Sequence, residues 1–343
     1  MPSKIAVIGT GSWGTAAAGL VAEGADQVVL WARSPEVAEA INQTHRNPRH
    51  LTGYRLPPNV SATHDPAQAV ADAQALVVAV PSNHLRRVLA GFAPQVGPAL
   101  PILVLTKGIE PATHLLMTEV VSDVLGHPER VAALTGPNHA EEVCLHMVSA
   151  AVVGAQDDAV ASLFQRLFLS TNFRVYKTDD LRGIEVCAAI KNVIAIACGV
   201  CGGCGYGDNT MAVIMTRGLA EMSRVVVTLG GDPLTCMGLA GMGDLVVTCT
   251  SDHSRNRTFG TALARGASLA SYESATHMVV EGARAAVSIH ELSQERGIET
   301  PLTDAVHAIL YEGTNIEEAA RTLLARTPDE EFYGLDQRAR TDS

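Results

Sequence analysis

Short apolar runs alternate with helix-length segments over the first half of the chain. The runs span residues 5–8, 28–31, 76–80, 102–105, 131–134 and 148–153. Each run is continuously apolar rather than alternating with polar positions, which is typical of strands covered on both faces of a sheet. Because strands and helices take turns along this part of the chain, we expect an α/β fold with a mostly parallel sheet.

From Gly183 onward the apolar positions recur with the period of a helix. The longest such segments span residues 184–198, 211–229, 281–296 and 302–311. A polar stretch, Lys177-Thr178-Asp179-Asp180, separates the two patterns. The patterns therefore predict an α/β domain over residues 1–182, an all-α domain over residues 183–333 and a polar C-terminal tail over residues 334–343.

The first apolar run leads into the segment GTGSWG, in which Gly9, Gly11 and Gly14 have G-x-G-x-x-G spacing. An Ala-rich helical segment from Thr15 to Glu23 follows directly. In this context Gly9 permits the tight turn, Gly11 lets the backbone approach a pyrophosphate, and Gly14 lets the helix pack on the sheet. The helix N-terminus then faces the anion. The context favours a Rossmann-type dinucleotide site over an ordinary glycine turn.

The second apolar run ends in Trp31-Ala32-Arg33, where sites that prefer NAD usually carry an acidic residue. A guanidinium at this place can pair with the 2′-phosphate of NADP and stack on the adenine. We therefore expect NADPH to bind at least as readily as NADH. The alternative, that Arg33 is a solvated surface residue, stays open because a single arginine is a weak signal.

Three charged residues stand in apolar or glycine-rich surroundings. Lys107 follows the strand at residues 102–105, at the carboxyl edge where open α/β sheets bind ligands. Lys191 lies in the middle of an apolar helical segment, and an unpaired buried ammonium is costly. Asp244 is the only charge in GLAGMGDLVVTC. Such charges indicate either chemistry or a structural ion pair.

The segment Ser254-Arg255-Asn256-Arg257 precedes a helical stretch at residues 258–265. Ser254 can cap this helix. The free N–H groups of a helix N-terminus, together with flanking arginines, form an anion site. The segment therefore indicates a phosphorylated small molecule as substrate.

The charge balance argues against nucleic acid as a partner. The chain has 25 basic and 36 acidic residues, a net charge of −11, and no basic cluster large enough to follow a phosphate backbone. The N-terminal segment lacks a signal-peptide pattern, and no apolar stretch reaches the ~18 residues of a membrane span. We expect a cytoplasmic protein without an integral membrane segment.

The cysteines and histidines show no metal-binding pattern. Seven cysteines in mostly apolar segments fit buried thiols in a reducing compartment, and we expect no structural disulfide. Cys198, Cys201 and Cys204 form a C-x-x-C-x-x-C run, but a fourth ligand is missing nearby, and the histidines lack H-E-x-x-H spacing. We therefore expect no metal.

Taken together, these segments resemble the bacterial NAD(P)-dependent glycerol-3-phosphate dehydrogenase family. The similarity covers nearly the whole chain through the motifs GTGSWG, LTKG, LTGPNHAEEV, KNVIAIA, GYGDNT, GLAGMGDLVVTC, SRNRTFG and VVEG, in family order. It implies a Rossmann-type dinucleotide-binding domain followed by an all-helical substrate and catalytic domain, in an enzyme that is typically a homodimer. The implied reaction interconverts sn-glycerol 3-phosphate and dihydroxyacetone phosphate with NAD(P)(H) and supplies glycerol 3-phosphate for phospholipid synthesis.

The resemblance also implies roles for individual residues. Lys191 matches the proton acceptor, with Asp244 as its polar partner. The substrate contacts are matched by Lys107, Gly136, Asn138, Lys191, Asp244, Ser254, Arg255 and Asn256. The contacts to NADPH or NADH are matched by Gly9, Gly11, Ser12, Trp13, Gly14, Arg33, Lys107, Ala140, Arg255, Val279 and Glu281, of which Val279 is the loosest match.

Two positions depart from the family pattern. Asn138 stands where the family usually has Ser, and Met211 stands where it usually has Lys. Asn138 can still donate and accept hydrogen bonds, so we expect substrate binding with altered geometry. No role is carried over to Met211.

Two alternatives stay open at this point. The anion site also fits other phosphorylated hydroxy compounds, oxidised by a dehydrogenase on the same two-domain plan. A redox sensor that binds NAD(P)H without catalysis would need only the glycine fingerprint. The chain additionally has the charged residues that a sensor would not need, namely Lys107, Lys191, Asp244 and Arg255.

Overall fold

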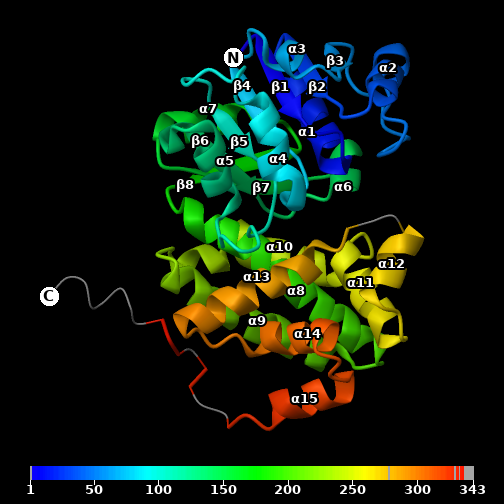
Figure 1. Cartoon of the computed structure of the whole chain (residues 1–343), viewed down its shortest axis with the longest axis vertical. Helices are drawn as coiled ribbons and strands as arrows, with labels where there is room; N and C mark the ends of the chain where they lie inside the picture. Colours follow the sequence, from blue (N-terminus) through cyan, green and yellow to red (C-terminus); the bar gives the residue numbers. More distant parts are fainter. Residues whose placement is uncertain (1, 277–278, 328–329, 332, 336–343) are drawn as a thin grey trace, which may run out of the picture. The chain divides into compact units, whose positions relative to one another are not determined.

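The computed structural model describes residues 2–276, 279–327, 330–331 and 333–335 (Figure 1). The chain forms two compact units: unit 1 comprises Met1–Lys107 and Leu115–Leu181, and unit 2 comprises Gly108–His114 and Arg182–Ser343. The chain thus enters unit 2 briefly, returns to unit 1, and then enters unit 2 again. Most of the polar tail expected over residues 334–343 lies outside the described residues.

Unit 1 holds one eight-stranded sheet with the order β3-β2-β1-β4-β5-β6-β7-β8. All neighbouring strands are parallel except β6 and β7, which are antiparallel. The strands are β1 Lys4–Ile8, β2 Gln27–Trp31, β3 Val60–Thr63, β4 Ala75–Val78, β5 Ile102–Val104, β6 Val131–Thr135, β7 Ser149–Ala155 and β8 Phe173–Thr178. The helices are α1 Ser12–Ala22, α2 Pro35–Thr44, α3 Pro66–Val70, α4 Ser82–Phe92, α5 Met117–Leu125, α6 Ala140–Cys144 and α7 Asp158–Phe168, with a 3₁₀ turn η1 at Pro128–Arg130.

Helices cover both faces of this sheet. In β1, Ile5 and Val7 belong to one buried cluster, to which α1, α2 and α7 contribute. Ala6 and Ile8 belong to a second cluster, to which α3, α4 and α5 contribute. A strand buried on both faces must be apolar at every position. The structure therefore confirms the mostly parallel α/β fold that the continuous apolar runs predict.

In its described residues unit 2 contains helices and no strand. These are α8 Leu181–Gly203, α9 Asp208–Thr228, α10 Asp244–Thr250, α11 Arg255–Ala264, α12 Leu269–Thr276, α13 Glu281–Arg296, α14 Pro301–Tyr311 and α15 Ile316–Leu324, with a 3₁₀ turn η2 at Pro233–Met237 and a π-helical turn η3 at Leu239–Gly243. The helical second half of the chain is confirmed.

Helix α8 is apolar on nearly all sides because it runs through the core of unit 2. By length and composition alone it is long and apolar enough to cross a membrane, contrary to the expectation that no apolar stretch reaches that length. However, 94% of its most apolar 18-residue window is buried inside the protein. An all-round apolar helix in a protein core meets the same criterion.

The short segment Gly108–His114 belongs to unit 2 because it contacts α13. The Ser288 hydroxyl donates to the carbonyl oxygen of Ile109 at 3.4 Å. The ring of His114 lies between two carboxylates of α13, with Nε2 at 3.3 Å from Glu291 and Nδ1 at 3.4 Å from Glu295. This segment lies between β5 and α5 in the sequence, so the loop after β5 is held by the helical unit.

The carboxyl of Glu221, on α9, caps helix α14 inside the core of unit 2. Its side chain accepts hydrogen bonds from Leu302 N at 2.8 Å, Thr303 N at 3.0 Å and the Thr303 hydroxyl, and the residue is 1% exposed. Burial raises the pKa of Glu221 from its ordinary value of 4.5 to about 7, although the hydrogen bonds lower it. The folded chain therefore holds a proton on Glu221 at pH values where the unfolded chain has released it.

We expect this proton to make stability depend on pH. The contribution of Glu221 is complete below pH 4.5 and is lost as the pH rises through about 7, because the native state binds more protons in this window. The slope is at most about 1.4 kcal/mol per pH unit. Urea denaturation of the wild type and of Glu221→Gln across this window measures it. The wild type should lose stability relative to the variant as the pH rises, and a constant difference would contradict the raised pKa.

Candidate active site

The segment Gly9–Gly14 after β1, called the glycine loop below, contains two positions where only glycine fits. Gly9 has a φ of +114°, and a Cβ there would lie 2.5 Å from the carbonyl oxygen of Ala79. A Cβ on Gly14 would lie 2.1 Å from the carbonyl oxygen of Gly9. These close approaches let α1 begin directly at the end of β1, which is the geometry that the fingerprint predicts.

Gly11 differs because the space beside it is open: a Cβ there would meet no heavy atom within 4 Å. Gly11 is also the N-cap of α1, and this N-cap residue has no side chain to cap the first N–H groups of the helix. Ser12 and Trp13 form the first turn, and the indole Nε1 of Trp13 is buried without a hydrogen-bond partner among the described residues. An open loop with uncapped helical N–H groups fits the pyrophosphate of a dinucleotide.

Asn47 holds the glycine loop in place. Its Nδ2 donates to the carbonyl oxygen of Thr10 and to the hydroxyl of Thr15, each at 2.8 Å. Asn47 is 1% exposed, so its amide is committed to the loop. Asn47 does not stand out in the sequence, because an asparagine in the loop between α2 and β3 carries no pattern that distinguishes it.

Arg33 lies close to the glycine loop along the sheet edge. The N–H of Gly9 donates to the carbonyl oxygen of Trp31, the last residue of β2, at 3.2 Å. Arg33 follows two residues later and is exposed. Because β1 and β2 are parallel, their carboxyl ends meet at one edge, and Arg33 is placed at that edge beside the loop.

The remaining predicted residues of unit 1 follow β5 and β6. Lys107 comes three residues after the end of β5, and Gly136 comes directly after β6. Gly136 has a φ of +152°, and a Cβ there would lie 2.7 Å from the carbonyl oxygen of Ala150. Asn138 is 8% exposed, and its Nδ2 is buried without a hydrogen-bond partner among the described residues. Ala140 begins α6.

In unit 2, the two lone charges of the sequence form an ion pair. Lys191, on α8, donates from Nζ to Oδ1 of Asp244 at 2.7 Å and to the hydroxyl of Thr248 at 2.8 Å. The side chains of Lys191 and Asp244 are 6% and 3% exposed. Thr248, one turn after Asp244 on α10, was not predicted, and its spacing of four residues from Asp244 is the signal that could have found it.

The glycine-rich segment before Asp244 brings this carboxylate to α8. Gly241 lies in the π-helical turn η3, and a Cβ there would lie 2.1 Å from the carbonyl oxygen of Cys236. The turn η3 therefore packs against η2 through its backbone. Asp244 follows as the first residue of α10. The small residues of GLAGMGD are needed for this packing.

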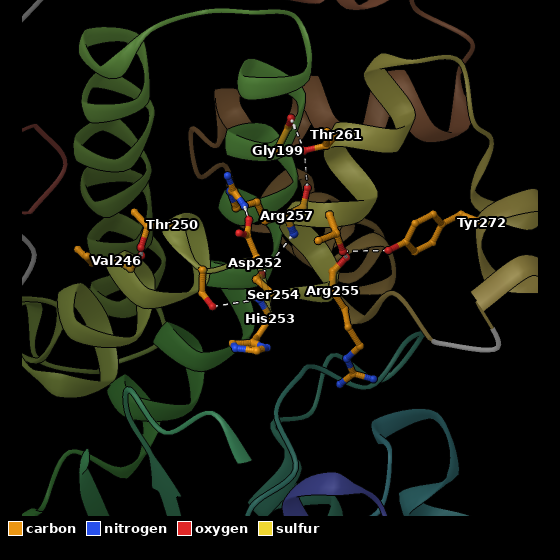
Figure 2. Close-up of polar contacts among 12 residues, drawn as sticks. Gly199, Val246, Thr250, Asp252, His253, Ser254, Arg255, Arg257, Thr261 and Tyr272 are labelled. Carbon is orange, nitrogen blue, oxygen red and sulfur yellow. Dashed lines mark hydrogen bonds and ion pairs between the residues drawn. The ribbon is translucent and has the colours of Figure 1, made fainter. Parts of the chain in front are cut away.

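Two glycines bring α11 against α8. A Cβ on Gly199 would lie 2.0 Å from the carbonyl oxygen of Arg257, and one on Gly260 would lie 2.2 Å from that of Ile196. The Thr261 hydroxyl donates to the carbonyl oxygen of Gly199 at 3.2 Å (Figure 2). The N-terminal turn of α11 is thus fixed on the helix that carries Lys191.

Ser254 caps α11, as the sequence predicts, and the helix begins at Arg255. The Ser254 hydroxyl accepts from the backbone N–H of Arg257 at 3.3 Å. The two arginines differ: Arg257 pairs with Asp252 at 2.5 Å, whereas the guanidinium of Arg255 makes no ion pair with any described residue. Figure 2 shows the exposed Arg255 side chain pointing away from the other labelled side chains.

Asn256 joins three helices of unit 2. Its Nδ2 donates to Oδ1 of Asn192, the neighbour of Lys191, at 2.9 Å. Its Oδ1 accepts from the N–H of Gly282, in the first turn of α13, at 2.9 Å. Asn256 is 7% exposed. The first turns of α11 and α13 are therefore tied to the Lys191 turn of α8.

Val279 and Glu281 lie at the start of α13, beside this junction. Glu281 is its first residue, and the N–H of Val280 donates to Oε1 of Glu273 at 2.9 Å. Glu273, on α12, was not singled out by the sequence. Met211 lies in the first turn of α9, and nothing in the structure assigns it a role.

The comparisons with known proteins agree with this arrangement. The profile described as the N-terminus of NAD-dependent glycerol-3-phosphate dehydrogenase matches residues 4–161, and that of the C-terminus matches residues 180–321. The chain belongs to the NAD-dependent glycerol-3-phosphate dehydrogenase family. This confirms the resemblance that the motifs indicate.

Relatives of this glycerol-3-phosphate dehydrogenase family match over nearly their whole length. A glycerol-3-phosphate dehydrogenase [NAD(P)+] of Nocardia farcinica is 46% identical, with 94% of this chain and 98% of the relative covered. One of Thermobifida fusca is 45% identical, with 97% and 100% covered. The crystal structure of glycerol-3-phosphate dehydrogenase from Coxiella burnetii has a TM-score of 0.89 at 35% identity, with 94% of this chain and 99% of that chain covered.

Membership of the glycerol-3-phosphate dehydrogenase family makes the chain an NAD(P)-dependent oxidoreductase with a nicotinamide cofactor. The family membership therefore favours an enzyme and excludes the alternative of a redox sensor without catalysis. The predicted residues lie in two groups: those of unit 1 gather at the carboxyl edge of the parallel strands, and those of unit 2 gather around the Lys191 turn of α8.

Proposed function

We propose that this enzyme interconverts sn-glycerol 3-phosphate and dihydroxyacetone phosphate, with Lys191 as the group that exchanges the proton. The observation that carries the proposal is the buried Lys191 ammonium, held by Asp244 and Thr248 and joined through Asn192 and Asn256 to the N-terminal turn that carries Arg255. A buried lysine and the N-terminal turn of a helix thus belong to one hydrogen-bonded cluster, which supports proton transfer and phosphate binding at the same site.

When bound, the nicotinamide supplies the hydride acceptor or donor. In the oxidative direction, Lys191 takes the proton from the C2 hydroxyl as the C2 carbonyl forms. In the reductive direction, Lys191 returns this proton to the C2 oxygen. The amine must therefore start neutral in one direction and charged in the other.

The surroundings of Lys191 act on its charge in opposite directions. Burial favours the neutral amine, because an ammonium loses its hydration. The carboxylate of Asp244 at 2.7 Å favours the ammonium. Asp244 and the Thr248 hydroxyl also fix the position of Nζ, which lets the protein hold the proton at one place.

The cofactor would be held by the glycine loop, with Ser12 and Trp13 at the start of α1. The uncapped helical N–H groups and the open space beside Gly11 support this assignment. On the substrate side, the buried Nδ2 of Asn138 has no hydrogen-bond partner within the described part of the chain, which supports a contact with an oxygen atom of the ligand. Lys107 and Gly136, at the same sheet edge, complete the set proposed for unit 1.

Arg33 is proposed to bind the 2′-phosphate of NADP, and Arg33→Ala is expected to weaken NADPH more than NADH. Only NADPH presents a phosphate for a charge-assisted pair, worth about 1.5–3 kcal/mol. Kd values of both cofactors, measured by fluorescence titration, check this. Arg174→Ala is the matched control, because Arg174 is exposed on β8 at the opposite end of the sheet order. If Arg33→Ala weakened the binding of NADPH and NADH equally, Arg33 would contribute only by stacking on the adenine.

The proposed reaction is tested by substrate choice. NADPH and NADH oxidation is followed with dihydroxyacetone phosphate, with unphosphorylated dihydroxyacetone and with phosphorylated hydroxy-acid analogues in their keto forms. We expect turnover with dihydroxyacetone phosphate and very little with dihydroxyacetone. If a phosphorylated keto acid were turned over faster than dihydroxyacetone phosphate, the substrate would instead be one of the other phosphorylated hydroxy compounds.

We further propose that the enzyme acts in the cytoplasm as a homodimer and supplies glycerol 3-phosphate for phospholipid synthesis. Cys198, Cys201 and Cys249 are buried thiols of unit 2, which suits a reducing compartment. The mass of the enzyme in solution, measured by light scattering, tests the dimer.

A further inference from the structure

A second group of chemically active side chains lies on α13 and α14, and the proposed reaction does not use it. One ligand atom from each of His290, His307 and Glu312 lies within 4.8 Å of the others. The imidazoles of His290 and His307 stack with ring centroids 4.1 Å apart. The two histidine side chains are 22% and 15% exposed, and that of Glu312 is 54% exposed, so solvent reaches the group.

The carboxylate of Asp304 forms a hydrogen bond with His290, one member of this group. Its Oδ1 lies 2.7 Å from Nδ1 of His290, and the Thr300 hydroxyl donates to the same oxygen at 3.3 Å. A proton on Nδ1 shared with Asp304 leaves Nε2 of His290 as the nitrogen with a free lone pair. Histidines that bind metals usually have such a carboxylate behind them, which sets the tautomer and the ring direction.

The backbone around the group is held by contacts between the same two helices. The Tyr311 hydroxyl, on α14, donates to the carbonyl oxygen of Ala283, on α13, at 2.9 Å. The ring of Tyr311 also lies against His307, with centroids 5.2 Å apart. The two histidines therefore stay adjacent, and only Glu312, in the turn after α14, needs to adjust its side chain.

We propose that His290, His307 and Glu312 bind one divalent transition-metal ion of the Zn²⁺ type at the surface of unit 2. Two imidazoles and one carboxylate are the donors that such ions prefer, whereas Mg²⁺ and Ca²⁺ require a shell of oxygen ligands. Zn²⁺ holds its ligands at about 2.0–2.2 Å, so binding draws the three ligand atoms closer together. Water takes the fourth position, because the site has three protein ligands.

The metal would cross-link α13 to α14 and the turn after it. An ion that binds the folded chain and not the unfolded one stabilises the fold in proportion to the logarithm of its concentration over Kd. The competing explanation is two separate histidine–carboxylate pairs, His290 with Asp304 and His307 with Glu312 at 3.0 Å. Such pairs are hydrogen-bonded contacts and have no affinity for a metal beyond that of any surface histidine.

The test is calorimetric titration of the full chain with Zn²⁺, with thermal unfolding measured alongside. We expect one saturable site in the wild type, loss of that site in His307→Asn, and binding about 10- to 100-fold weaker in Asp304→Asn. His127→Asn is the matched control, because His127 pairs with the carboxylate of Glu129 at 3.1 Å on unit 1. This control should bind Zn²⁺ like the wild type. Zn²⁺ should raise Tm in the wild type and in the control, and Mg²⁺ should not.

The absorption spectrum of bound Co²⁺ distinguishes binding at this site from binding by a cysteine such as the exposed Cys204. Co²⁺ bound by histidine and carboxylate lacks the thiolate charge-transfer band that Co²⁺ bound by cysteine shows. Saturable binding that is equal in the wild type, His307→Asn and Asp304→Asn would overturn the proposal, as would a thiolate band or no saturable binding in the wild type. Asp304→Asn keeps all three ligands, so it decides the matter if His307→Asn does not fold.

Discussion

Lys191→Ala is expected to lower kcat by about 10²- to 10⁴-fold, because the group that exchanges the proton at C2 is removed. The affinity for NADPH should change little, since the proposed cofactor contacts lie elsewhere. Steady-state kinetics in both directions, together with a cofactor titration, measure the two quantities separately. A variant that keeps more than about a third of the wild-type kcat at neutral pH would exclude Lys191 as the base.

The stability of this variant needs its own control. Removing Lys191 takes this ion pair away from the buried carboxylate of Asp244, and breaking a buried pair in this way costs about 3–5 kcal/mol. The double variant Lys191→Met with Asp244→Asn removes both charges and keeps the volume of the side chains. We expect it to regain much of the free energy of unfolding while kcat stays as low as in Lys191→Ala. Activity that returned with stability would instead indicate a structural ion pair.

Arg255→Ala is expected to raise the KM for dihydroxyacetone phosphate steeply and to lower kcat as well. The guanidinium of Arg255 lies at the N-terminal turn of α11, where helical N–H groups and the helix dipole also attract an anion. Binding energy from the phosphate positions C2 for the reaction, so its loss affects both constants. The gap in kcat/KM between dihydroxyacetone phosphate and dihydroxyacetone should narrow, because a site built for a dianion disfavours a ligand without one.

Arg265→Ala is the matched control for this experiment, because Arg265 is an exposed arginine at the other end of the same helix. It should leave both kinetic constants and the phosphate preference unchanged. If Arg255→Ala also kept the full preference for the phosphorylated substrate, the phosphate would have to bind elsewhere. Lys107 would then be the next residue to replace.

The strands that the sequence predicts are those buried in the middle of the sheet. The two strands that it does not predict, β3 and β8, form the two edges. Their exposure alternates along the chain, and β8 reads FRVYKT, with its charged side chains exposed. An edge strand is covered less completely, so its sequence lacks the continuous apolar run of a central strand. The polar pair Lys177 and Thr178, which marked the boundary in the sequence, lies at the end of β8.

The sequence predicts individual residues of the candidate site, but it does not predict which of them contact one another. Lys191 and Asp244 stand out because each is a charge among apolar neighbours. That they pair with each other follows only from the packing of the η2 and η3 turns against one another, which depends on Gly241. Thr248 and Asn47 are ordinary polar residues in the sequence, and their roles arise from neighbours distant along the chain.

The crossing of the chain between the two units limits how the enzyme can be recombined with its relatives. A chimaera joined at residue 181 would take α13 from one parent and the segment Gly108–His114 from the other. Ser288, Glu291 and Glu295 would then face a foreign version of Ile109 and His114. A chimaera therefore keeps these contacts intact only when the loop after β5 is exchanged together with the helical half.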